Sequence, residues 1–235
     1  MGSSVIEEAG HNTLVREMTL QIWRQYRKRQ QNDITKNERK VTELKVIAFN
    51  GSPRINGNTE QSLKIVLAEL KNEGIETEII QLGGRKVFGC LACGMCLETK
   101  DNRCIRQDDE MNIFIRKMIE ADGIIIGSPT YCSNVSTEVK ALIDRCGFVS
   151  KANGGDMLRG KVGAAVVSVR RAGATFTYSA INFFFGISEM VMPSSSYWNM
   201  TLALNPGDVQ KDEEGIQTFQ TLGKNIATLL KQLKG

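Results

Sequence analysis

Four of the six cysteines lie within fifteen residues in the spacing C-x2-C-x2-C-x7-C, as Cys90, Cys93, Cys96 and Cys104. Thiolates at every third residue of a Gly-containing loop can wrap one iron–sulfur cluster, as bacterial ferredoxin loops do. A tetrahedral zinc site more often uses two C-x2-C pairs separated by a longer stretch. The loop therefore favours an iron–sulfur cluster, with free thiols, disulfides or zinc as the alternatives. Cys132 and Cys146 are expected to be small buried residues rather than ligands.

A second candidate site is the polar loop of residues 50–59, which follows an apolar run and opens a helical pattern. Gly51 and Gly57 allow its backbone to turn and to approach a ligand closely. The helix start offers free N–H groups, and further donors come from Ser52, Asn56, Asn58 and Thr59. Such a loop can cradle one phosphate; a plain turn capped by Asn58 is the alternative. It lacks the Lys-Ser/Thr ending of a Walker loop and the Gly-x-Gly-x-x-Gly dinucleotide fingerprint.

Two further loops offer a wall and a lid for a planar ligand. In residues 127–136, Pro129 and Tyr131 can form a rigid flat wall, and Asn134 can bond the edge of a heterocycle. Residues 168–175 are small, polar and basic, and can close over the far side of that ring. The alternatives are a helix-entry loop capped by Ser136 and a solvated basic turn. Together with the phosphate cradle, these loops describe a pocket for flavin mononucleotide (FMN).

The three loops need a scaffold that brings them to one place. Short apolar runs predict five strands, at residues 45–50, 76–82, 123–127, 161–169 and 188–191. Apolar residues at helical spacing predict helices over 59–72, 111–121, 137–146, 175–185 and 216–233. Strands that alternate with helices predict an α/β domain with a doubly wound, five-stranded parallel sheet. The loops then lie beyond the carboxyl ends of the strands, where such sheets bind their ligands.

Residues 1–41 are predicted to be a helical extension and linker that precede the domain of residues 42–235. An apolar stripe at helical spacing is formed by Val15, Met18, Ile22 and Tyr26, and residues 32–40 are polar. A lone helix cannot bury its own stripe. We therefore expect this N-terminal helical arm to pack on the body or on another subunit, with a membrane-surface helix as the alternative.

Composition and charge exclude several classes of protein. The 235 residues are 41% hydrophobic and 24% charged, as is typical of a globular chain. The net charge is +4, of which +3 falls in residues 1–41, so no nucleic-acid surface is expected on the body. The single histidine, His11, argues against histidine-based catalysis. No stretch approaches the ~20 apolar residues of a membrane span and no secretory signal is visible, so we expect a cytoplasmic protein with no membrane partner.

The order Gly-Ser-Pro-Arg-x-x-Gly-Asn-Thr at residues 51–59, then Ser-Pro-Thr-Tyr-x-x-Asn-Val-Ser at 128–136, resembles the flavodoxin-like NAD(P)H-dependent FMN reductases and their iron–sulfur flavoprotein branch. The resemblance covers roughly residues 45–234 and implies a flavodoxin-like fold. It implies that the FMN phosphate is bound by Ser52, Arg54, Asn56, Asn58 and Thr59. It implies that the flavin ring lies against Pro129, Thr130, Tyr131, Asn134, Ser168, Arg170, Arg171 and Gly173.

The same resemblance implies a 4Fe-4S cluster on the cysteine-rich loop of residues 90–104, since the compact cysteine motif carries one in the iron–sulfur branch. Ile105, where ferredoxins have proline after the fourth cysteine, is a departure from the ferredoxin pattern. The loop follows the second predicted strand, on the phosphate side of the flavin. The resemblance therefore implies that the cluster serves the flavin of a neighbouring subunit, in a homodimer or homotetramer.

The implied function is an FMN-dependent oxidoreductase that takes electrons from NAD(P)H or ferredoxin. The electrons pass through FMN and the cluster to a small acceptor such as a quinone or an oxygen species. One alternative is a cluster-free NAD(P)H-dependent FMN or quinone reductase, and another is a non-enzymatic electron carrier of the flavodoxin type. Such carriers are usually acidic, whereas the body of this chain is nearly neutral. A third alternative is a redox sensor whose cysteines switch a partner-binding surface.

Overall fold

The computed structural model describes Gln21 and residues 44–234. Its five strands are β1 (Lys45–Asn50), β2 (Glu76–Gln81), β3 (Gly123–Pro129), β4 (Val162–Val169) and β5 (Met200–Leu202). They form one sheet in the order β2-β1-β3-β4-β5, and all neighbouring strands are parallel. This order confirms the predicted flavodoxin-like, doubly wound sheet. The N-terminal arm predicted for residues 1–41 lies outside the described residues, apart from Gln21.

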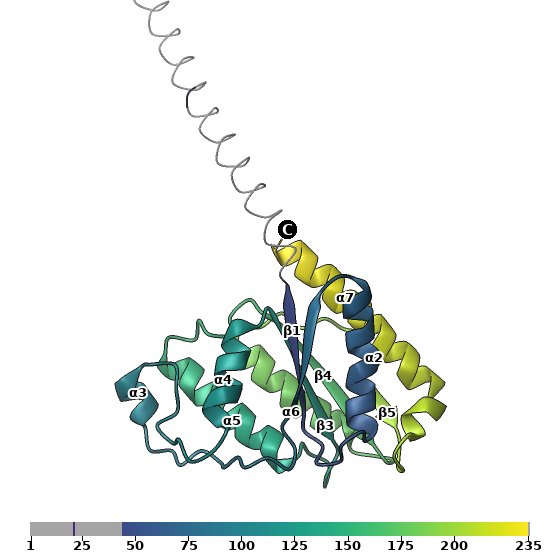
Figure 1. Cartoon of the computed structure of the whole chain (residues 1–235), viewed down its shortest axis with the longest axis horizontal. Helices are drawn as coiled ribbons and strands as arrows, with labels where there is room; N and C mark the ends of the chain where they lie inside the picture. The colour runs from purple at the N-terminus through teal and green to yellow at the C-terminus, as the bar shows by residue number, and fades with distance from the viewer. Residues whose placement is uncertain (1–20, 22–43, 235) are drawn as a thin grey trace, which may run out of the picture. The chain divides into compact units, whose positions relative to one another are not determined.

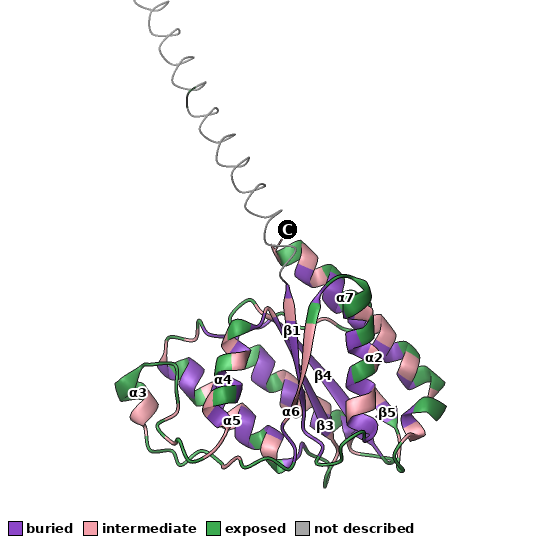
Figure 2. Ribbon diagram, viewed as in Figure 1, coloured by how far each residue is buried: buried purple, intermediate pink, exposed green. Residues whose placement is uncertain are grey.

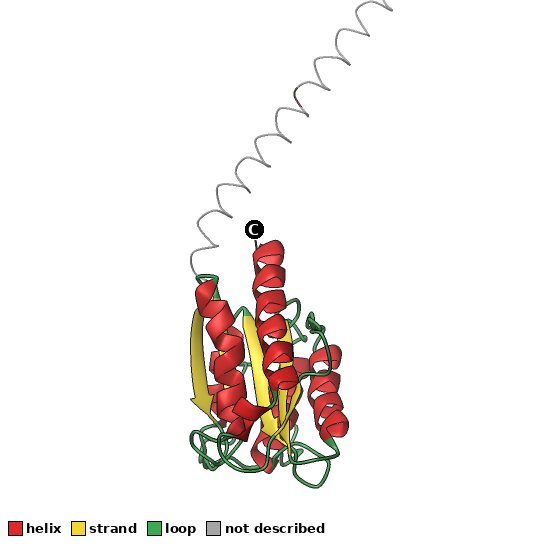
Figure 3. Cartoon of the chain, turned by 90° about the vertical axis from the view of Figure 1, so that its right-hand side faces the viewer, coloured by secondary structure: helices red, strands yellow, loops and turns green. Residues whose placement is uncertain are grey.

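Helices cover both faces of the sheet (Figures 1 and 3). They are α2 (Asn58–Asn72), α3 (Met95–Thr99), α4 (Met111–Glu120), α5 (Thr137–Ala152), α6 (Ala174–Ile187) and α7 (Glu213–Lys234), with a 3-10 helix, η2 (Asp208–Lys211). The buried residues of α2 and α7 form one core cluster with the sheet, and those of α4, α5 and α6 form another. None of the helices within the described residues has the length and apolarity needed to cross a bilayer.

The strands β1, β3 and β4 are buried almost throughout (Figure 2). On β1, Val46 and Ala48 belong to the cluster of α2 and α7, whereas Ile47 and Phe49 belong to the opposite cluster. The side chains of a strand point alternately to its two faces, so an apolar run fits a sheet that is covered on both sides. Ladder pairing aligns the ends of neighbouring strands, with Asn50 opposite both Gln81 and Gly127. The loops that follow these strands therefore start at one edge.

The prediction of a strand at residues 188–191 is wrong. Those residues terminate α6: Glu189 has a left-handed backbone with φ 55°, and the N–H of Met190 donates to the carbonyl oxygen of Phe185 at 3.0 Å. This is the hydrogen-bond pattern of a Schellman cap. Val191 makes only an isolated bridge to Val162. The fifth strand lies further along, at Met200–Leu202, and pairs with β4.

The other predicted elements are found with shifted ends. The helix predicted to end at residue 146 continues as α5 to Ala152, and Ser136 caps its start by accepting a bond from the Val139 N–H at 3.5 Å. The cysteine loop contains a short helix, α3, that the spacing did not indicate. Because α3 lies outside α4 and α5, the cysteine loop covers the outer side of that helix layer (Figure 1).

Candidate functional site

A hollow of about 560 Å³, which includes open solvent, lies at the carboxyl edge of the sheet. Most of its lining residues were predicted from the sequence, namely Ser52, Arg54, Asn58, Thr59, Pro129, Thr130, Tyr131, Ser168 and Arg170. Ala203 and Leu204, which follow β5, complete the lining and were not predicted. Residues that are distant in the chain thus meet because β1, β3, β4 and β5 end at the same edge.

The loop after β1 is held by its own short polar side chains. The side-chain oxygen of Asn50 accepts a bond from the Ser52 N–H at 3.1 Å, and the Ser52 hydroxyl accepts one from the Arg54 N–H at 3.2 Å. The Gly51 N–H donates to the carbonyl oxygen of Gly127 at 2.8 Å. A Cβ at Gly51 would lie 2.3 Å from the Val139 side chain. The glycine therefore allows the first loop to pack directly against the start of α5.

Gln81 and Gly83, at the end of β2, support this loop from the other side and were not predicted. The Gln81 side-chain N–H₂ donates to the carbonyl oxygens of Ser52 and Gly83, both at 2.7 Å. Its oxygen accepts a bond from the Asn50 side chain at 2.7 Å. A Cβ at Gly83 would lie 2.3 Å from the Ser52 carbonyl carbon. These contacts join residues about thirty positions apart, so no local pattern could indicate them.

The hollow offers polar groups that suit a phosphorylated ligand. Helix α2 begins beside it with Gly57 as N-cap and has no side-chain cap at that end, and uncapped N–H groups of a helix start favour an anion. The Ser168 hydroxyl is buried and has no hydrogen-bond partner among the described residues. Exposed Arg54 and Arg170 add positive charge at the lining. The donor set therefore fits the phosphate and polar edges of FMN.

Asn58 lines the hollow, but its side chain is occupied by bonds within the protein. Its N–H₂ donates to the Asn205 carbonyl oxygen at 2.8 Å, and its oxygen accepts bonds from the N–H groups of Gly207 and Val209 at 3.0 and 3.4 Å. These bonds fix the segment after β5 against the start of α2. The structure therefore places Asn58 as a residue that positions Ala203 and Leu204, which come just before this segment.

Four predicted FMN contacts do not line the hollow: Asn56, Asn134, Arg171 and Gly173. The Asn56 side-chain oxygen accepts a bond from Lys64 at 3.2 Å, and its N–H donates to Glu60 at 2.6 Å, on the exposed side of α2. Arg171 is exposed. Gly173 has φ +89° at the start of α6, where a Cβ would lie 2.5 Å from the Ser133 hydroxyl oxygen. Gly173 therefore packs against the turn of residues 131–134.

That turn projects one lining residue into the hollow. Tyr131 and Asn134 exchange backbone hydrogen bonds of 2.9 Å in both directions, across Cys132 and Ser133 with φ of 47° and 59°. Positive φ at both central residues is the geometry of a type I′ turn. Tyr131 remains 44% exposed at the rim. The expectation that Cys132 is buried is wrong, because it lies at the exposed tip of this turn.

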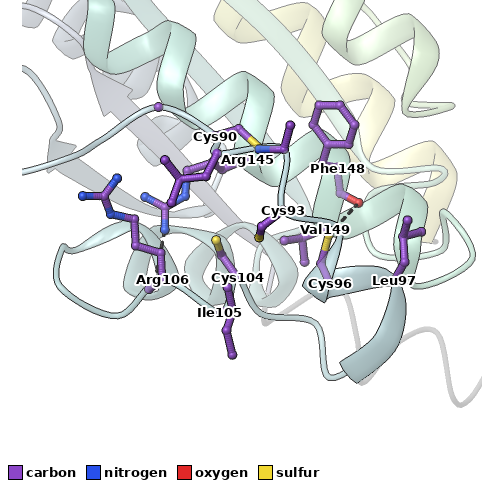
Figure 4. Close-up of a pocket in the computed structure, with 14 residues that line it drawn as sticks. Cys90, Cys93, Cys96, Leu97, Cys104, Ile105, Arg106, Arg145, Phe148 and Val149 are labelled. Carbon is purple, nitrogen blue, oxygen red and sulfur yellow. Dashed lines mark hydrogen bonds between the residues drawn. The ribbon is translucent and has the colours of Figure 1, made fainter.

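A second hollow, of about 730 Å³ including open solvent, is lined by all four clustered cysteines, Cys90, Cys93, Cys96 and Cys104 (Figure 4). Phe148 and Arg145 of α5 form part of its wall. Burial raises the pKa of the Cys96 thiol, and the neighbouring thiolates of Cys104, Cys90 and Cys93 raise it further.

The last cysteine of the loop is held by a side chain of α4, and the first takes part in a hydrogen bond within the loop. The Asn112 side chain on α4 accepts a bond from the Cys104 N–H at 2.8 Å and donates to the Cys104 carbonyl oxygen at 2.9 Å. The Ala92 N–H points to the Cys90 sulfur at 3.4 Å. No group of three or more His, Cys, Asp or Glu residues in the described part of the chain is placed to hold a single metal ion. Four thiols around one hollow are the type of ligand that a group with several metal atoms needs.

Cys146 should be chemically inert. It is fully buried on α5, and burial raises the pKa of its thiol to about 12. At pH 8 the thiolate fraction is then roughly one part in ten thousand, and the thiolate is the reactive form. In iron-free protein treated with iodoacetamide at pH 8, mass spectrometry should find Cys132 alkylated and Cys146 unmodified. In urea both should react; labelling of Cys146 in the native protein would contradict its burial.

Comparisons with known proteins identify the family to which the chain is related. Residues 44–204 match the family described as NADPH-dependent FMN reductase. An iron–sulfur flavoprotein of Methanocaldococcus jannaschii is 38% identical over 198 residues, which are 81% of this chain and 100% of that protein. A second iron–sulfur flavoprotein of the same organism is 31% identical over 201 residues, 82% of this chain and 100% of that protein.

A solved structure supports the fold independently. A WrbA-like flavodoxin from Agrobacterium tumefaciens superposes with a TM-score of 0.56, covering 81% of this chain and 98% of that chain. Its sequence is 15% identical, so this likeness concerns the arrangement of strands and helices alone.

Proposed function

We propose that this chain, which belongs to the NADPH-dependent FMN reductase family and is an FMN-dependent oxidoreductase, binds FMN at the carboxyl edge of its sheet and a 4Fe-4S cluster on its cysteine loop. Electrons enter from NAD(P)H or ferredoxin and leave to a small acceptor such as a quinone or an oxygen species. The observation that carries the proposal is the meeting of loops from β1, β3, β4 and β5 around one hollow.

The chain's own residues supply binding and orientation at the FMN site. The start of α2, with Ser52 and Thr59, receives the phosphate, and Arg54 adds positive charge. Pro129 and Tyr131 would lie against the ring, and the buried Ser168 hydroxyl would bond a polar edge of the ring. Bound FMN supplies the redox chemistry, since it accepts two electrons as hydride and releases them singly.

The cysteine hollow supports the cluster by its donor set. A single zinc ion needs all its thiolates about 2.3 Å from one point, whereas a 4Fe-4S cluster takes one thiolate on each iron. Four thiols that line one hollow, without converging on a single point, suit the second arrangement. Two similar proteins are named iron–sulfur flavoproteins, and these names support an iron–sulfur group on the cysteine loop.

The placement of the two hollows supports a homo-oligomer. They have no lining residue in common. Large apolar side chains are exposed around the cysteine hollow, namely Leu91, Leu97, Ile105 and Phe148. A second copy that covered these side chains would remove apolar area from water and bring its own FMN towards the cluster. We therefore propose that electrons pass between subunits of a homodimer or homotetramer.

The test begins with protein purified without oxygen. We expect flavin absorption with an added broad shoulder, about one FMN and about four irons with matching sulfide per chain. Cys93→Ser should remove the iron and leave FMN bound, because the two hollows are separate. The matched control, Cys132→Ser, should keep the iron, since Cys132 lies outside the cysteine hollow.

Different outcomes separate the parts of the proposal. Flavin absorption bands without iron would support a cluster-free reductase. A colourless protein that stays free of FMN in excess FMN would overturn the proposed FMN site. Turnover is then measured with NADPH, NADH or reduced ferredoxin and a quinone as acceptor. If none of these donors reduced the bound FMN, the proposed reductase activity would be overturned and a non-enzymatic electron carrier favoured.

A further inference from the structure

The lining of the cysteine hollow includes a charged residue that the proposed function does not yet use, Arg145 on α5. Its side chain is fully buried, and it lines the hollow together with the four clustered cysteines (Figure 4). Arginine remains positively charged in proteins. A charge at this depth persists only where partners satisfy it.

Two of its three nitrogens have partners within the protein. Nη1 donates to the Phe88 carbonyl oxygen at 3.2 Å and to the carboxylate of Asp109, and Nη2 donates to the Arg106 carbonyl oxygen at 3.3 Å. The third nitrogen, Nε, is buried and has no acceptor among the described residues. Native proteins rarely leave a buried donor unpaired, so an acceptor in the hollow is the natural partner for this N–H.

We propose that the Arg145 Nε–H donates a hydrogen bond to a sulfur of the cluster and thereby raises its reduction potential. The inference rests on the proposed function, because it requires the cluster. A cluster held by four thiolates is negatively charged, and reduction adds a further negative charge. A hydrogen bond to sulfur therefore stabilises the reduced form more than the oxidised form, and such bonds are known to set cluster potentials.

Asp109 fixes the direction of this donor. Its carboxylate accepts bonds from the N–H groups of Phe88 at 3.0 Å and Met111 at 3.2 Å, as well as from Arg145. The carboxylate is thus tied to the start of α4 while the planar guanidinium is held at three sites. Asp109 is the positioning residue in this arrangement, and it also neutralises the charge of Arg145 locally. The hydrogen bond, rather than net charge, is what Arg145 adds to the hollow.

Arg145→Lys tests the inference. Lysine places a methylene where arginine has Nε–H, and it keeps a positive charge to pair with Asp109. We expect the cluster to assemble and its midpoint potential to fall by at least 59 mV. For one electron, this shift corresponds to a tenfold change in the ratio of oxidised to reduced cluster. The potential is measured by anaerobic titration followed by electron paramagnetic resonance.

The matched control is Arg116→Lys, on the exposed face of α4, where Arg116 pairs with Glu120 at 3.9 Å. It should leave the cluster potential unchanged. An Arg145→Lys protein with wild-type iron content and wild-type potential would overturn the inference while the proposed function stands. A wild-type protein that binds no iron would overturn the inference together with the cluster part of the proposed function.

A second variant addresses failure of the lysine protein to fold. Arg145→Met with Asp109→Leu removes both charges of the pair together, a replacement that buried ion pairs often tolerate. The local net charge is unchanged, so a lower potential again reports the lost N–H donor. A potential equal to that of the wild type in this protein would reject a hydrogen bond from Arg145 to the cluster.

Discussion

Replacing Gly83 by alanine should weaken FMN binding on the order of a hundredfold. The new Cβ would lie 2.3 Å from the carbonyl carbon of Ser52 and 2.6 Å from the carbonyl oxygen of Gly51. All of these contacts are backbone atoms, so no side-chain rotation relieves them. The loop of residues 50–59 must therefore move, and we expect FMN to lose one hydrogen bond to its charged phosphate. Such a bond contributes about 1.5–3 kcal/mol. Its loss corresponds to a roughly ten- to 150-fold lower affinity.

The measurement is a titration of FMN into apoprotein, followed by quenching of flavin fluorescence. Circular dichroism and urea unfolding show whether the variant retains the fold, for which we expect a cost of about 1–3 kcal/mol from overpacking. Gly147→Ala is the control. A Cβ at Gly147, inside α5, meets only ring carbons of Phe184 at 3.7 and 3.8 Å, so FMN affinity should not change. Equal affinity in the Gly83 variant would show that Gly83 does not support the loop.

The sheet could be predicted where apolar runs are long and helices cover both faces. β3 and β4 are of this kind, since nearly every residue is buried. β5 could not be found in this way, because it has only three residues and one of them is the buried polar Thr201. The run at 188–191 ends in the apolar residues Met190 and Val191, but the cap of α6 uses its backbone groups. Whether such a segment caps a helix or forms a strand is decided by its tertiary packing.

The binding loops could be predicted because their residue types act locally. Glycines, hydroxyls and a helix start within residues 51–59 indicate an anion site regardless of the rest of the chain. Long-range support leaves no such signal: Gln81 and Gly83 reach Ser52 only through strand pairing. Asn58 has the right type for a phosphate ligand, yet its partners lie about 150 positions away, after β5. The role of a polar side chain thus depends on which neighbours the fold brings to it.

At the cysteine loop, too, some residues of the site are indicated by the sequence and others only by the structure. The spacing of the four cysteines indicates their common role, and the structure places them around one hollow. Arg145 and Asp109 carry no such signal, because Arg145 falls within an ordinary amphipathic helix and Asp109 within a run of acidic residues. Their burial as a pair follows from the packing of α5 against the start of α4, which only the structure shows.

The Asp109–Arg145 pair leads to the second large prediction: Asp109→Ala should lower the free energy of unfolding by about 3–5 kcal/mol. Both side chains are fully buried. Removing one partner leaves a charge in the interior without compensation, which is the costly way to break such a pair. The variant also removes the acceptor for the N–H groups of Phe88 and Met111, so the loop before α4 loses an anchor.

Urea unfolding of apoprotein, followed by circular dichroism, measures this loss without interference from bound groups. Asp108→Ala is the matched control, because Asp108 is the adjacent acid and its pair with Arg106 is exposed; its urea midpoint should equal that of the wild type. An Asp109→Ala midpoint that also matched the wild type would mean that water reaches Arg145 in solution. In that case the Nε–H would already be satisfied by solvent, and the reason to assign it to a sulfur of the cluster would disappear. The predicted stability of the pair and the proposed hydrogen bond to the cluster therefore depend on the same buried guanidinium.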